Sequence, residues 1–296
     1  MSQPRILLVG AAGQLGRALQ TSFANAGDLI ALDRSSADLS QPEQLRKLVI
    51  DSAPNIILNA AAYTAVDRAE SEVELAMTVN ALAPGVLAEA AKECSALLVH
   101  YSTDYVFDGS KSDPWVEEDL PNPLNAYGKS KLAGEQAIQR VGGKYLIFRT
   151  SWVYGPEGNN FLTTMLCLGR ERESLRIVDD QIGSPTSTIE LARGTRAIVD
   201  GVRIGKYGES KSWAGMYHMT CGGSVSWCGF AQAIFDRAGA LMNGNIPIVY
   251  PIPVTEYPTP AQRPLNSVLS NDKLYARFGL SLPAWDTALD TVLQLK

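Results

Sequence analysis

Short, continuously apolar runs recur along the first half of the chain, and the stretches between them carry apolar residues at helical spacing. A continuous apolar run is typical of a strand that is buried on both faces of a parallel sheet. The alternation of such strands with helices predicts an α/β fold with a doubly wound parallel sheet of the Rossmann type. The expected strands are 5–9, 29–33, 55–62, 96–101 and 145–150.

The regular alternation weakens after Thr150, so the chain is expected to divide there into two domains. Residues 1–150 are predicted to form the Rossmann domain, and residues 151–296 a smaller C-terminal α/β domain. The segment near 175–200 is expected to return to the first domain. The other expected elements are helices at 66–77, 79–92, 161–172, 188–199, 227–240, 271–278 and 284–295, strands at 175–178 and 215–219, and a proline-rich connection at 243–259.

The composition is that of an ordinary globular protein, and its charge argues against nucleic acid and membrane surfaces as partners. Apolar residues make up 46% of the chain and charged residues 19%, and the formal net charge is −5. An acidic chain is not expected to bind nucleic acid or a membrane surface, because both select basic surfaces. Neither an apolar run of membrane-spanning length nor a signal peptide is recognised, so the expected location is the cytoplasm. The four cysteines and two histidines lack zinc-ligand spacing, so no metal site is expected.

A glycine-rich turn after the first expected strand predicts a dinucleotide-binding site. Gly10, Gly13 and Gly16 follow that strand directly and lead into a helical pattern. Gly10 permits a tight turn, Gly13 lets the backbone approach a pyrophosphate, and Gly16 lets the helix pack close to the strand. The helix start, which includes Gln14 and Leu15, then offers free N–H groups to the phosphates.

Two adjacent residues after the second expected strand give opposite indications about the cofactor. Asp33 lies where an acid that binds the ribose hydroxyls of NAD is expected, with a cap or turn as its alternative role. Arg34 follows it directly, and an arginine pairs with the 2′-phosphate of NADP. The choice between NADH and NADPH therefore stays open. Asp38 and Leu39 continue this loop and are expected to line the cofactor site.

Small residues follow the third expected strand. Ala60, Ala61 and Ala62 would let a flat ring or a ribose lie against the backbone, with Tyr63 and Thr64 at the lip of the cleft. A close contact between a helix and the sheet explains each alanine nearly as well. The three alanines and the two residues after them are therefore candidates for cofactor contacts.

The fourth expected strand ends in hydroxyl and carboxyl groups. Thr103 and Asp104 lie at its carboxyl end, where open α/β sheets bind their ligands. Tyr101 is expected to contact the cofactor. His100 is expected to be a hydrogen-bonded structural residue of the sheet rather than a catalyst.

Tyr127 and Lys131 are a candidate acid–base pair. They lie four residues apart in a segment that reads as a helix, which places them on one face. A phenol has an unperturbed pKa of about 10, and a nearby ammonium lowers it. The spacing is common, and a solvated helix face is the alternative explanation.

Four features together resemble the extended short-chain dehydrogenases/reductases: the glycine turn, Asn59-Ala-Ala61, Ser102-Thr-Asp104 and Tyr127-x-x-x-Lys131. Longer segments are similar to the dTDP-4-dehydrorhamnose reductase family and span most of the chain. They are 100–107, 123–135, 148–154, 158–161, 179–186 and 257–267. These segments are far more specific than the glycine turn, which many nucleotide-binding enzymes share.

The resemblance implies that NADPH or NADH reduces the C4 ketone of dTDP-4-dehydro-L-rhamnose to give dTDP-L-rhamnose. Tyr127 would donate the proton, Lys131 would lower the pKa of Tyr127 and hold the nicotinamide ribose, and Thr103 would orient the carbonyl. The residues that the resemblance places against the sugar nucleotide are Thr103, Asp104, Tyr127, Trp152 and Arg263, the last as the partner of its diphosphate.

Two other functions stay open from the sequence. The first is an epimerase or dehydratase that acts on another nucleotide sugar, although Tyr105 stands where a dehydratase has its second acid. The second is a non-catalytic regulatory subunit that resembles the reductase. The resemblance also brings in Mg²⁺ at a subunit contact, but Ala18 and Ile189 lie where its acidic ligands are expected, so the sequence does not support the metal. Glu190 keeps a metal-bridged dimer open as an alternative. The chain is expected to be a monomer or a homodimer.

Overall fold

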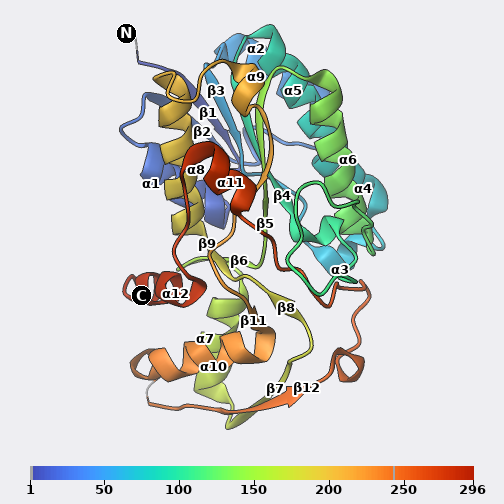
Figure 1. Cartoon of the computed structure of the whole chain (residues 1–296), viewed down its shortest axis with the longest axis vertical. Coiled ribbons are helices and arrows are strands. Elements are labelled where there is room, and N and C mark those ends of the chain that lie inside the picture. The colour runs from blue at the N-terminus through green and yellow to red at the C-terminus, as the bar shows by residue number, and fades with distance from the viewer. Residues whose placement is uncertain (1–2, 243) are drawn as a thin grey trace.

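Six parallel strands form the centre of the larger lobe in the computed structural model, which describes residues 3–242 and 244–296 (Figure 1). Their order across the sheet is β10-β5-β4-β3-β1-β2. The strands are β1 (Arg5–Val9), β2 (Asp28–Leu32), β3 (Ile56–Asn59), β4 (Leu97–Thr103), β5 (Lys144–Thr150) and β10 (Gly215–His218). The chain moves from β1 outward to β2 and then crosses to β3 on the other side of β1. The switch point that binds ligands in open α/β sheets therefore lies between β1 and β3.

Helices cover both faces of this sheet, which confirms the predicted doubly wound α/β fold. Alternate residues of each strand enter two separate cores: Ile6 and Leu8 face one layer, and Leu7 and Val9 face the other. The first layer contains α1 (Gln14–Phe23), α8 (Thr188–Arg203) and α11 (Asp272–Phe278). The second contains α2 (Pro42–Ser52), α5 (Ala83–Glu93) and α6 (Ala126–Val141).

Segments from the second half of the chain complete the larger lobe. α8 packs along α1. β10 pairs with β5 in parallel, with His218 opposite Arg149, and so becomes an edge of the sheet. The division of the chain into functional domains at residue 150 stays a prediction.

The connection between β3 and β4 contains more and shorter helical segments than the two helices expected there. It contains α3 (Val66–Ala69), α4 (Val73–Met77) and the π-helical turn η1 (Thr78–Leu82) before α5. Among the described residues, the run Val73–Glu93 is long and apolar enough to cross a membrane by length and composition alone. The expectation that no apolar run has this length is therefore wrong. Part of the run packs in the core of the larger lobe, where Ala83 and Leu87 are buried against the sheet.

The smaller lobe is built around a separate apolar core from α7 (Phe161–Glu171), α10 (Trp227–Arg237) and α12 (Trp285–Leu293). It lies below the carboxyl ends of the strands in Figure 1. Paired strands brace it: β7 (Ser174–Val178) with β12 (Ile248–Ile252), β8 (Ile182–Gly183) with β11 (Val225–Ser226), and β6 (Val153–Tyr154) with β9 (Thr186–Ser187). The short elements that remain are η2 (Asp104–Val106), α9 (Ser210–Trp213), η3 (Gly239–Met242) and η4 (Val254–Glu256).

The expectation of an unbroken connection over 243–259 is wrong at 248–252. That segment forms β12, which pairs in parallel with β7 and contains Pro251. A two-stranded ribbon leaves one side of each strand unpaired, so proline is tolerated there. Asn243, where the expected connection begins, lies outside the described residues.

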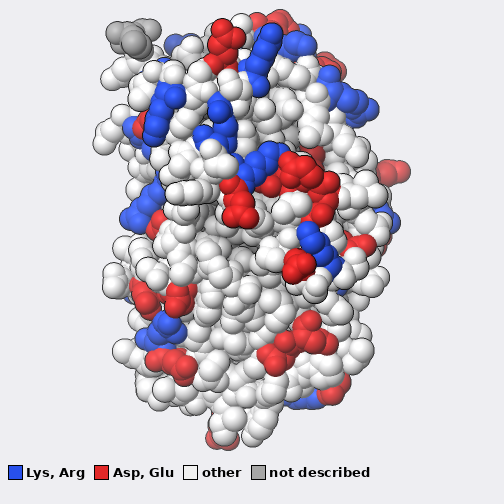
Figure 2. Space-filling model, viewed as in Figure 1, with Lys and Arg blue, Asp and Glu red and all other residues white. Residues whose placement is uncertain are grey.

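The described charges are mixed on the face drawn in Figure 2, where Lys and Arg side chains are interspersed with Asp and Glu. Much of the surface of the smaller lobe on this face is uncharged. The exposed ion pairs of the described residues include Lys273 with Glu118 and Arg203 with Asp200. Such exposed pairs contribute little to stability.

Candidate functional site

A cavity of about 700 Å³ lies at the carboxyl ends of the central strands and extends toward the smaller lobe. Its wall contains Gly10 after β1, Ala60 after β3, Thr103 at the end of β4, and Trp152 and Trp227 from the second half of the chain. It therefore includes the switch point between β1 and β3. Almost all of the residues expected to bind a cofactor line it: Gly10, Gly13, Gln14, Leu15, Arg34, Asp38, Leu39, Ala60, Ala61, Ala62, Tyr63, Thr64, Tyr101, Tyr127 and Lys131.

The glycine turn has the geometry that close approach of a ligand requires. Gly10 has a φ of +85°, and a Cβ there would lie 2.6 Å from the backbone nitrogen of Ala61. Gly16 does not line the cavity; a Cβ on it would collide with the carbonyl oxygen of Gly10, so this glycine lets α1 pack on the turn. Among the described residues, no side chain caps the N-terminus of α1 at Gly13. Its N–H groups and positive dipole end are therefore suited to an anion such as a pyrophosphate.

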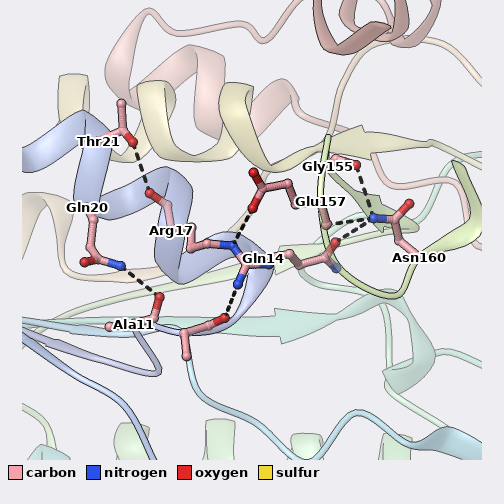
Figure 3. A network of polar contacts seen from close by, with 9 residues as sticks. Ala11, Gln14, Arg17, Gln20, Thr21, Gly155, Glu157 and Asn160 are labelled. Carbon is pink, nitrogen blue, oxygen red and sulfur yellow. Dashed lines mark hydrogen bonds and ion pairs between the residues drawn. The ribbon is translucent and has the colours of Figure 1, made fainter. Parts of the chain in front are cut away.

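Gln14 joins this turn to the loop after β6. Its amide nitrogen donates to the Val153 carbonyl over 3.3 Å, and its amide oxygen accepts from Asn160 over 3.3 Å. Arg17, one helical turn further along α1, pairs with Glu157 at 3.2 Å. Figure 3 shows these side chains bridging α1 and the loop that holds Gly155, Glu157 and Asn160. The bridge holds the glycine-turn end of the cavity against the second half of the chain.

Asp33 is not on the wall of the cavity, contrary to its expected contact with the ribose. Its carboxylate accepts hydrogen bonds from the Ser35 N–H at 3.0 Å, the Ser35 hydroxyl at 2.6 Å and the Ser36 N–H at 3.2 Å. Chiefly the Ser35 hydroxyl, and also the Ser36 N–H, hold the pKa of Asp33 below its usual value. Asp33 therefore orders its own turn, while Arg34, Asp38 and Leu39 line the cavity, and its contact with a ribose stays a prediction.

The segment after β3 lies along the cavity and is held in place by Asn80. The Asn80 side chain accepts from the Tyr63 N–H at 2.9 Å and donates to the Tyr63 carbonyl at 3.0 Å. The Tyr63 hydroxyl donates to Glu72 at 2.7 Å. Ala60, Ala61 and Ala62 are partly exposed on this wall.

α6 brings Tyr127 and Lys131 to the cavity. The helix begins at Ala126, where the Asn125 side chain accepts a capping hydrogen bond from the Gly128 N–H at 2.8 Å. Tyr127 lies in the first turn, edge-on to Tyr105, with the two ring centroids 5.9 Å apart. The i,i+4 spacing places Lys131 on the same face of the helix, and both residues line the cavity.

Lys131 is held by groups at the end of β4. Its Nζ donates to the Tyr101 carbonyl over 2.6 Å and lies 3.2 Å from His100 Nε2. The other nitrogen of His100, Nδ1, lies 3.0 Å from the Asn59 amide. His100 is therefore the hydrogen-bonded sheet residue that the sequence predicted, and it also contacts the candidate active-site amine.

Burial outweighs the lowering of the Tyr127 pKa that was expected from Lys131. Burial raises the pKa of Tyr127 to about 12, the Thr103 hydroxyl opposes this by hydrogen bonding, and the negative charge of Asp104 raises it further. Burial also lowers the pKa of Lys131 to about 8, against the opposing charge of Glu135. Desolvation therefore dominates both groups, because the site lies deep between the lobes. At neutral pH the phenol keeps its proton and the amine is mostly charged.

The Asp104 side chain lies at the carboxyl end of β4, and 3% of its surface is exposed. Its Oδ1 accepts from the Thr103 hydroxyl at 3.0 Å, and its Oδ2 accepts from the Ser151 hydroxyl at 3.0 Å. Thr103 in turn accepts the Tyr105 N–H at 3.1 Å. Burial raises the pKa of Asp104 to about 6, and hydrogen bonds from hydroxyl groups oppose the shift. The cavity therefore contains a carboxyl group that titrates close to neutral pH.

Trp152 lies on the wall facing the smaller lobe. It adopts a left-handed backbone conformation with a φ of +45°, and its ring stacks on Trp227 with 3.4 Å between the centroids. Gly183 leaves room for this ring, since a Cβ at that position would collide with it. Strained backbone of this kind persists only where the surroundings hold it, and it concentrates at functional sites.

Arg263, which was expected to contact a diphosphate, is not among the residues that line the cavity, but it is hydrogen-bonded to Tyr105, which is. Its guanidinium donates to Asp67 over 2.8 Å and also to Thr259 and to the Ala261 carbonyl. The Asp67 carboxylate also accepts the Ala261 N–H at 3.2 Å. These hydrogen bonds connect the loop that precedes Ser267 to α3. The N–H donors of Arg263 are therefore used in a contact between two segments of the chain.

Sequence reasoning missed several residues of the wall, notably Tyr105, Trp227, Arg68 and Glu72. Tyr105 directly follows Thr103 and Asp104, so its position beside them was the available signal. Trp227 comes from a distant segment and carries no signal in the sequence. Arg68 and Glu72 form an ion pair, at a spacing that reads as an ordinary helix surface.

A second cavity, of about 600 Å³, contains the place where the resemblance brought in Mg²⁺. Ala18 and Ile189 line it and offer no ligand oxygen. Its charged residues are Arg17, Glu157 and Arg193, and Glu157 is paired with Arg17 at 3.2 Å. Glu190 pairs with Arg193 at 2.7 Å. Hard divalent cations need several oxygen ligands, so these residues do not fit Mg²⁺.

Comparisons of the sequence with known proteins find relatives that match nearly the whole chain. The family model described as RmlD substrate binding domain matches residues 4–296. A dTDP-4-dehydrorhamnose reductase from Burkholderia thailandensis is 50% identical over 290 residues, which cover 96% of this chain and 96% of that protein. Another from Escherichia coli is 45% identical over 296 residues, which cover 97% of this chain and 96% of that protein.

Solved structures share the fold over its full length. The structure of dTDP-4-dehydrorhamnose reductase from Bacillus anthracis in complex with NADP has a TM-score of 0.89 and 36% identity, covering 100% of both chains. The structure of Thermus thermophilus UDP-glucose 4-epimerase in complex with NAD has a TM-score of 0.75 and 21% identity, covering 98% of both chains, and shows the fold alone. Sequence and structure together show that the chain belongs to the dTDP-4-dehydrorhamnose reductase family.

Proposed function

We propose that this protein is the NAD(P)H-dependent reductase that converts the C4 ketone of dTDP-4-dehydro-L-rhamnose to the alcohol of dTDP-L-rhamnose. One observation carries the proposal: Thr103, Tyr127 and Lys131 meet at the carboxyl end of β4 in the cavity that also contains the glycine turn. A single cavity can therefore present a bound dinucleotide to a sugar ketone. The family membership of the chain supports the same substrate.

The residues at the switch point fit a nicotinamide dinucleotide. Gly10 leaves room that a Cβ would fill, and the uncapped N-terminus of α1 at Gly13 suits the pyrophosphate. Ala60, Ala61 and Ala62 would lie along the ribose and ring. The cofactor, when bound, supplies the hydride that reduces the ketone.

The side chains of the protein would stabilise and then protonate the negative charge that develops on the carbonyl oxygen. Tyr127 holds its proton at neutral pH because burial raises its pKa, so it is in the correct state to act as a general acid. Lys131, mostly charged, would bind the ribose hydroxyls and stabilise the phenolate that remains after the transfer. The Thr103 hydroxyl would orient the carbonyl beside Asp104.

The sugar nucleotide would extend from Thr103 toward the second half of the chain. Asp104 and Trp152 would contact the sugar or the base, with Trp227 supporting the ring of Trp152. Residues 1–150 are proposed to provide most of the cofactor site, and residues 151–296 to provide the wall facing the sugar nucleotide. We place the protein in the cytoplasm, as a monomer or homodimer that does not require a metal, nucleic acid or membrane.

Specific observations disfavour the two other functions. Tyr105, not glutamate, follows Asp104 on the cavity wall, so the second acid of a dehydratase is missing at that position. A regulatory subunit has no need to keep Thr103, Tyr127 and Lys131 together in one cavity.

The test is loss of NADPH absorbance with dTDP-4-dehydro-L-rhamnose, followed by analysis of the sugar product by NMR. We expect cofactor oxidation that depends on the keto-sugar, with one mole of dTDP-L-rhamnose formed per mole oxidised. Tight cofactor binding without oxidation would contradict the reductase and favour a regulatory subunit. A product other than the C4 alcohol would contradict the assigned reaction.

A further inference from the structure

His100 is a buried histidine that contacts the amine of Lys131 but has no part in the proposed reaction. It is 1% exposed, and Lys131 is 2% exposed. His100 Nε2 lies 3.2 Å from Lys131 Nζ, and His100 Nδ1 lies 3.0 Å from the side-chain nitrogen of Asn59. Burial, and to a smaller extent the charge of Lys131, holds the pKa of His100 well below its usual value. The imidazole is therefore neutral and carries one proton, on one of its two nitrogens.

Asn59 decides which nitrogen of His100 carries that proton. Asn59 lies at the end of β3, opposite His100 on β4, and its amide oxygen accepts the Ala61 N–H at 3.2 Å. The amide nitrogen therefore faces His100, and an amide nitrogen only donates hydrogen bonds. His100 Nδ1 must accept this hydrogen bond, so the proton lies on Nε2.

This assignment points the Nε2–H of His100 at the amine of Lys131. An ammonium has three N–H donors and no acceptor, whereas a neutral amine has a lone pair. Lys131 Nζ already donates to the Tyr101 carbonyl over 2.6 Å. When Lys131 is charged, two N–H groups face each other across 3.2 Å, and when it is neutral its lone pair accepts the imidazole N–H. His100 therefore favours the uncharged form of the amine.

The other charges around Lys131 are paired, shared or exposed. Glu135, one turn along α6, favours the ammonium, but its carboxylate also accepts from Arg149 Nε and Nη2 over 2.8 and 2.6 Å. The titratable groups that share the cavity wall with Lys131 near its neighbouring elements are Tyr127, Tyr101, Asp104, Tyr105 and the paired Arg68 and Glu72. Asp67 of α3 pairs with Arg263, and Glu74, Glu89, Lys92 and Glu93 of α4 and α5 are exposed. In the described part of the chain, the groups within hydrogen-bond distance of Lys131 Nζ are His100 Nε2 and the Tyr101 carbonyl.

We propose that His100 is a positioning residue of this site, held by Asn59 with its proton on Nε2, and that this N–H, directed at Lys131 Nζ, favours loss of a proton from that amine. Lys131 then exchanges protons within the working pH range instead of acting as a fixed charge. The hydrogen-bond arrangement is independent of the proposed function, and only its effect on turnover rests on that function.

The first measurement assigns the tautomer of His100 in the free protein. The chain has two histidines, His100 and His218, so a protein labelled with ¹⁵N at histidine gives few signals, and the spectrum of His218→Leu assigns them. ¹⁵N NMR separates protonated from unprotonated ring nitrogens, and couplings to the ring protons distinguish Nδ1 from Nε2. We expect His100 to carry its proton on Nε2 at neutral pH, without cofactor or keto-sugar.

The second measurement follows the titration of Lys131 itself. ¹³C NMR of the lysine Cε atoms reports the loss of each ammonium proton, and Lys131→Arg assigns the signal. Burial lowers the pKa of Lys131 to about 8 in the wild-type protein. His100→Leu removes the opposing N–H and is expected to raise the midpoint to about 9, because a tenfold change in the proton equilibrium corresponds to about one hydrogen bond. The sign is diagnostic, since removal of an imidazole that accepted from the ammonium would lower the midpoint.

His218→Leu is the matched control for the loss of a buried ring. His218 is a fully buried histidine on β10, which is separated from β4 by β5. Its replacement is expected to leave the midpoint of Lys131 unchanged. When NADPH oxidation by the keto-sugar is measured, the alkaline limit of kcat in His100→Leu should move upward together with that midpoint.

Three results would overturn the inference. A proton on Nδ1 of His100 would mean that Nε2 accepts from the ammonium. An unchanged or lower Lys131 midpoint in His100→Leu would show that the imidazole does not favour the neutral amine. An equal rise in His218→Leu would show a general effect of lost packing. If His100→Leu does not fold, the tautomer in the wild-type protein decides alone. A wild-type protein that does not oxidise NADPH with the keto-sugar would contradict the proposed reaction and leave both NMR results valid.

Discussion

Replacement of Asp104 by asparagine should stabilise the protein at neutral pH and leave it unchanged in acid. The carboxyl group is 3% exposed, and burial raises its pKa to about 6. In the unfolded chain the pKa of an aspartate is about 3.9. The folded state therefore binds this proton more tightly, and folding stability is lost as the pH rises from about 4 to about 6.

The size of the effect follows from the two pKa values. Their difference corresponds to roughly 3 kcal/mol at pH 7, which is the cost of keeping the ionised group buried. Asparagine keeps an oxygen that accepts the Thr103 hydroxyl, and its amide can donate to Ser151. Asp104→Asn should therefore recover much of this energy above pH 6 and almost none at pH 4.

Thermal unfolding from pH 4 to pH 8 measures this difference. A matched control is Asp108→Asn, because Ser110 and Asn122 hold the pKa of Asp108 below its usual value. That substitution should destabilise the protein at neutral pH, with the opposite sign, because a lowered pKa adds stability above the unfolded value. A melting temperature for Asp104→Asn that is below that of the wild type at pH 7, or a pH-independent shift, would refute the reasoning.

Two further substitutions test the turn and the core. Gly10→Ala should abolish tight cofactor binding. Gly142→Ala, with a φ of +70° and a ψ of −155° but nothing within 4 Å of the added Cβ, should cost about 1–3 kcal/mol of backbone strain and leave cofactor binding unchanged. Equal effects on cofactor affinity in a titration would contradict the close-approach role of Gly10. Glu135→Gln should destabilise the protein by about 3–5 kcal/mol in urea unfolding, because Arg149 loses the partner of a buried ion pair with distances of 2.8 and 2.6 Å. The double change Glu135→Leu with Arg149→Met should cost less than Glu135→Gln, and a larger loss would show that the charges themselves stabilise the fold.

The fold of the larger lobe could be predicted because short stretches of the sequence indicate its strands, its glycine turn and the helix of Tyr127. Continuous apolar runs identified the central strands, and the glycine spacing identified the turn that Gly10 makes with a φ of +85°. The helix with Tyr127 and Lys131 was also recognised from its spacing. Each of these signals lies within a few residues of the structure that it predicts.

The rest of the site depends on contacts between segments that are distant in the sequence. Nothing near Arg263 in the chain indicates that Asp67 binds its guanidinium, and nothing near Trp152 indicates that Trp227 stacks on its ring. The pKa of Tyr127 was expected to fall because of Lys131, but burial by distant segments raises it. β12 was missed because its strand propensity is weakened by Pro251 and its partner β7 is about seventy residues earlier.

The central claim is that the Tyr127 hydroxyl delivers the proton to the sugar ketone. The most direct measurement compares kcat/KM for the keto-sugar with the Kd for NADPH in Tyr127→Phe, using Tyr105→Phe as the control that removes a hydroxyl from the same wall. We predict that Tyr127→Phe lowers kcat/KM by about 10²–10⁴-fold with an unchanged Kd, and that Tyr105→Phe has a much smaller effect. Near-normal turnover by Tyr127→Phe would contradict the account.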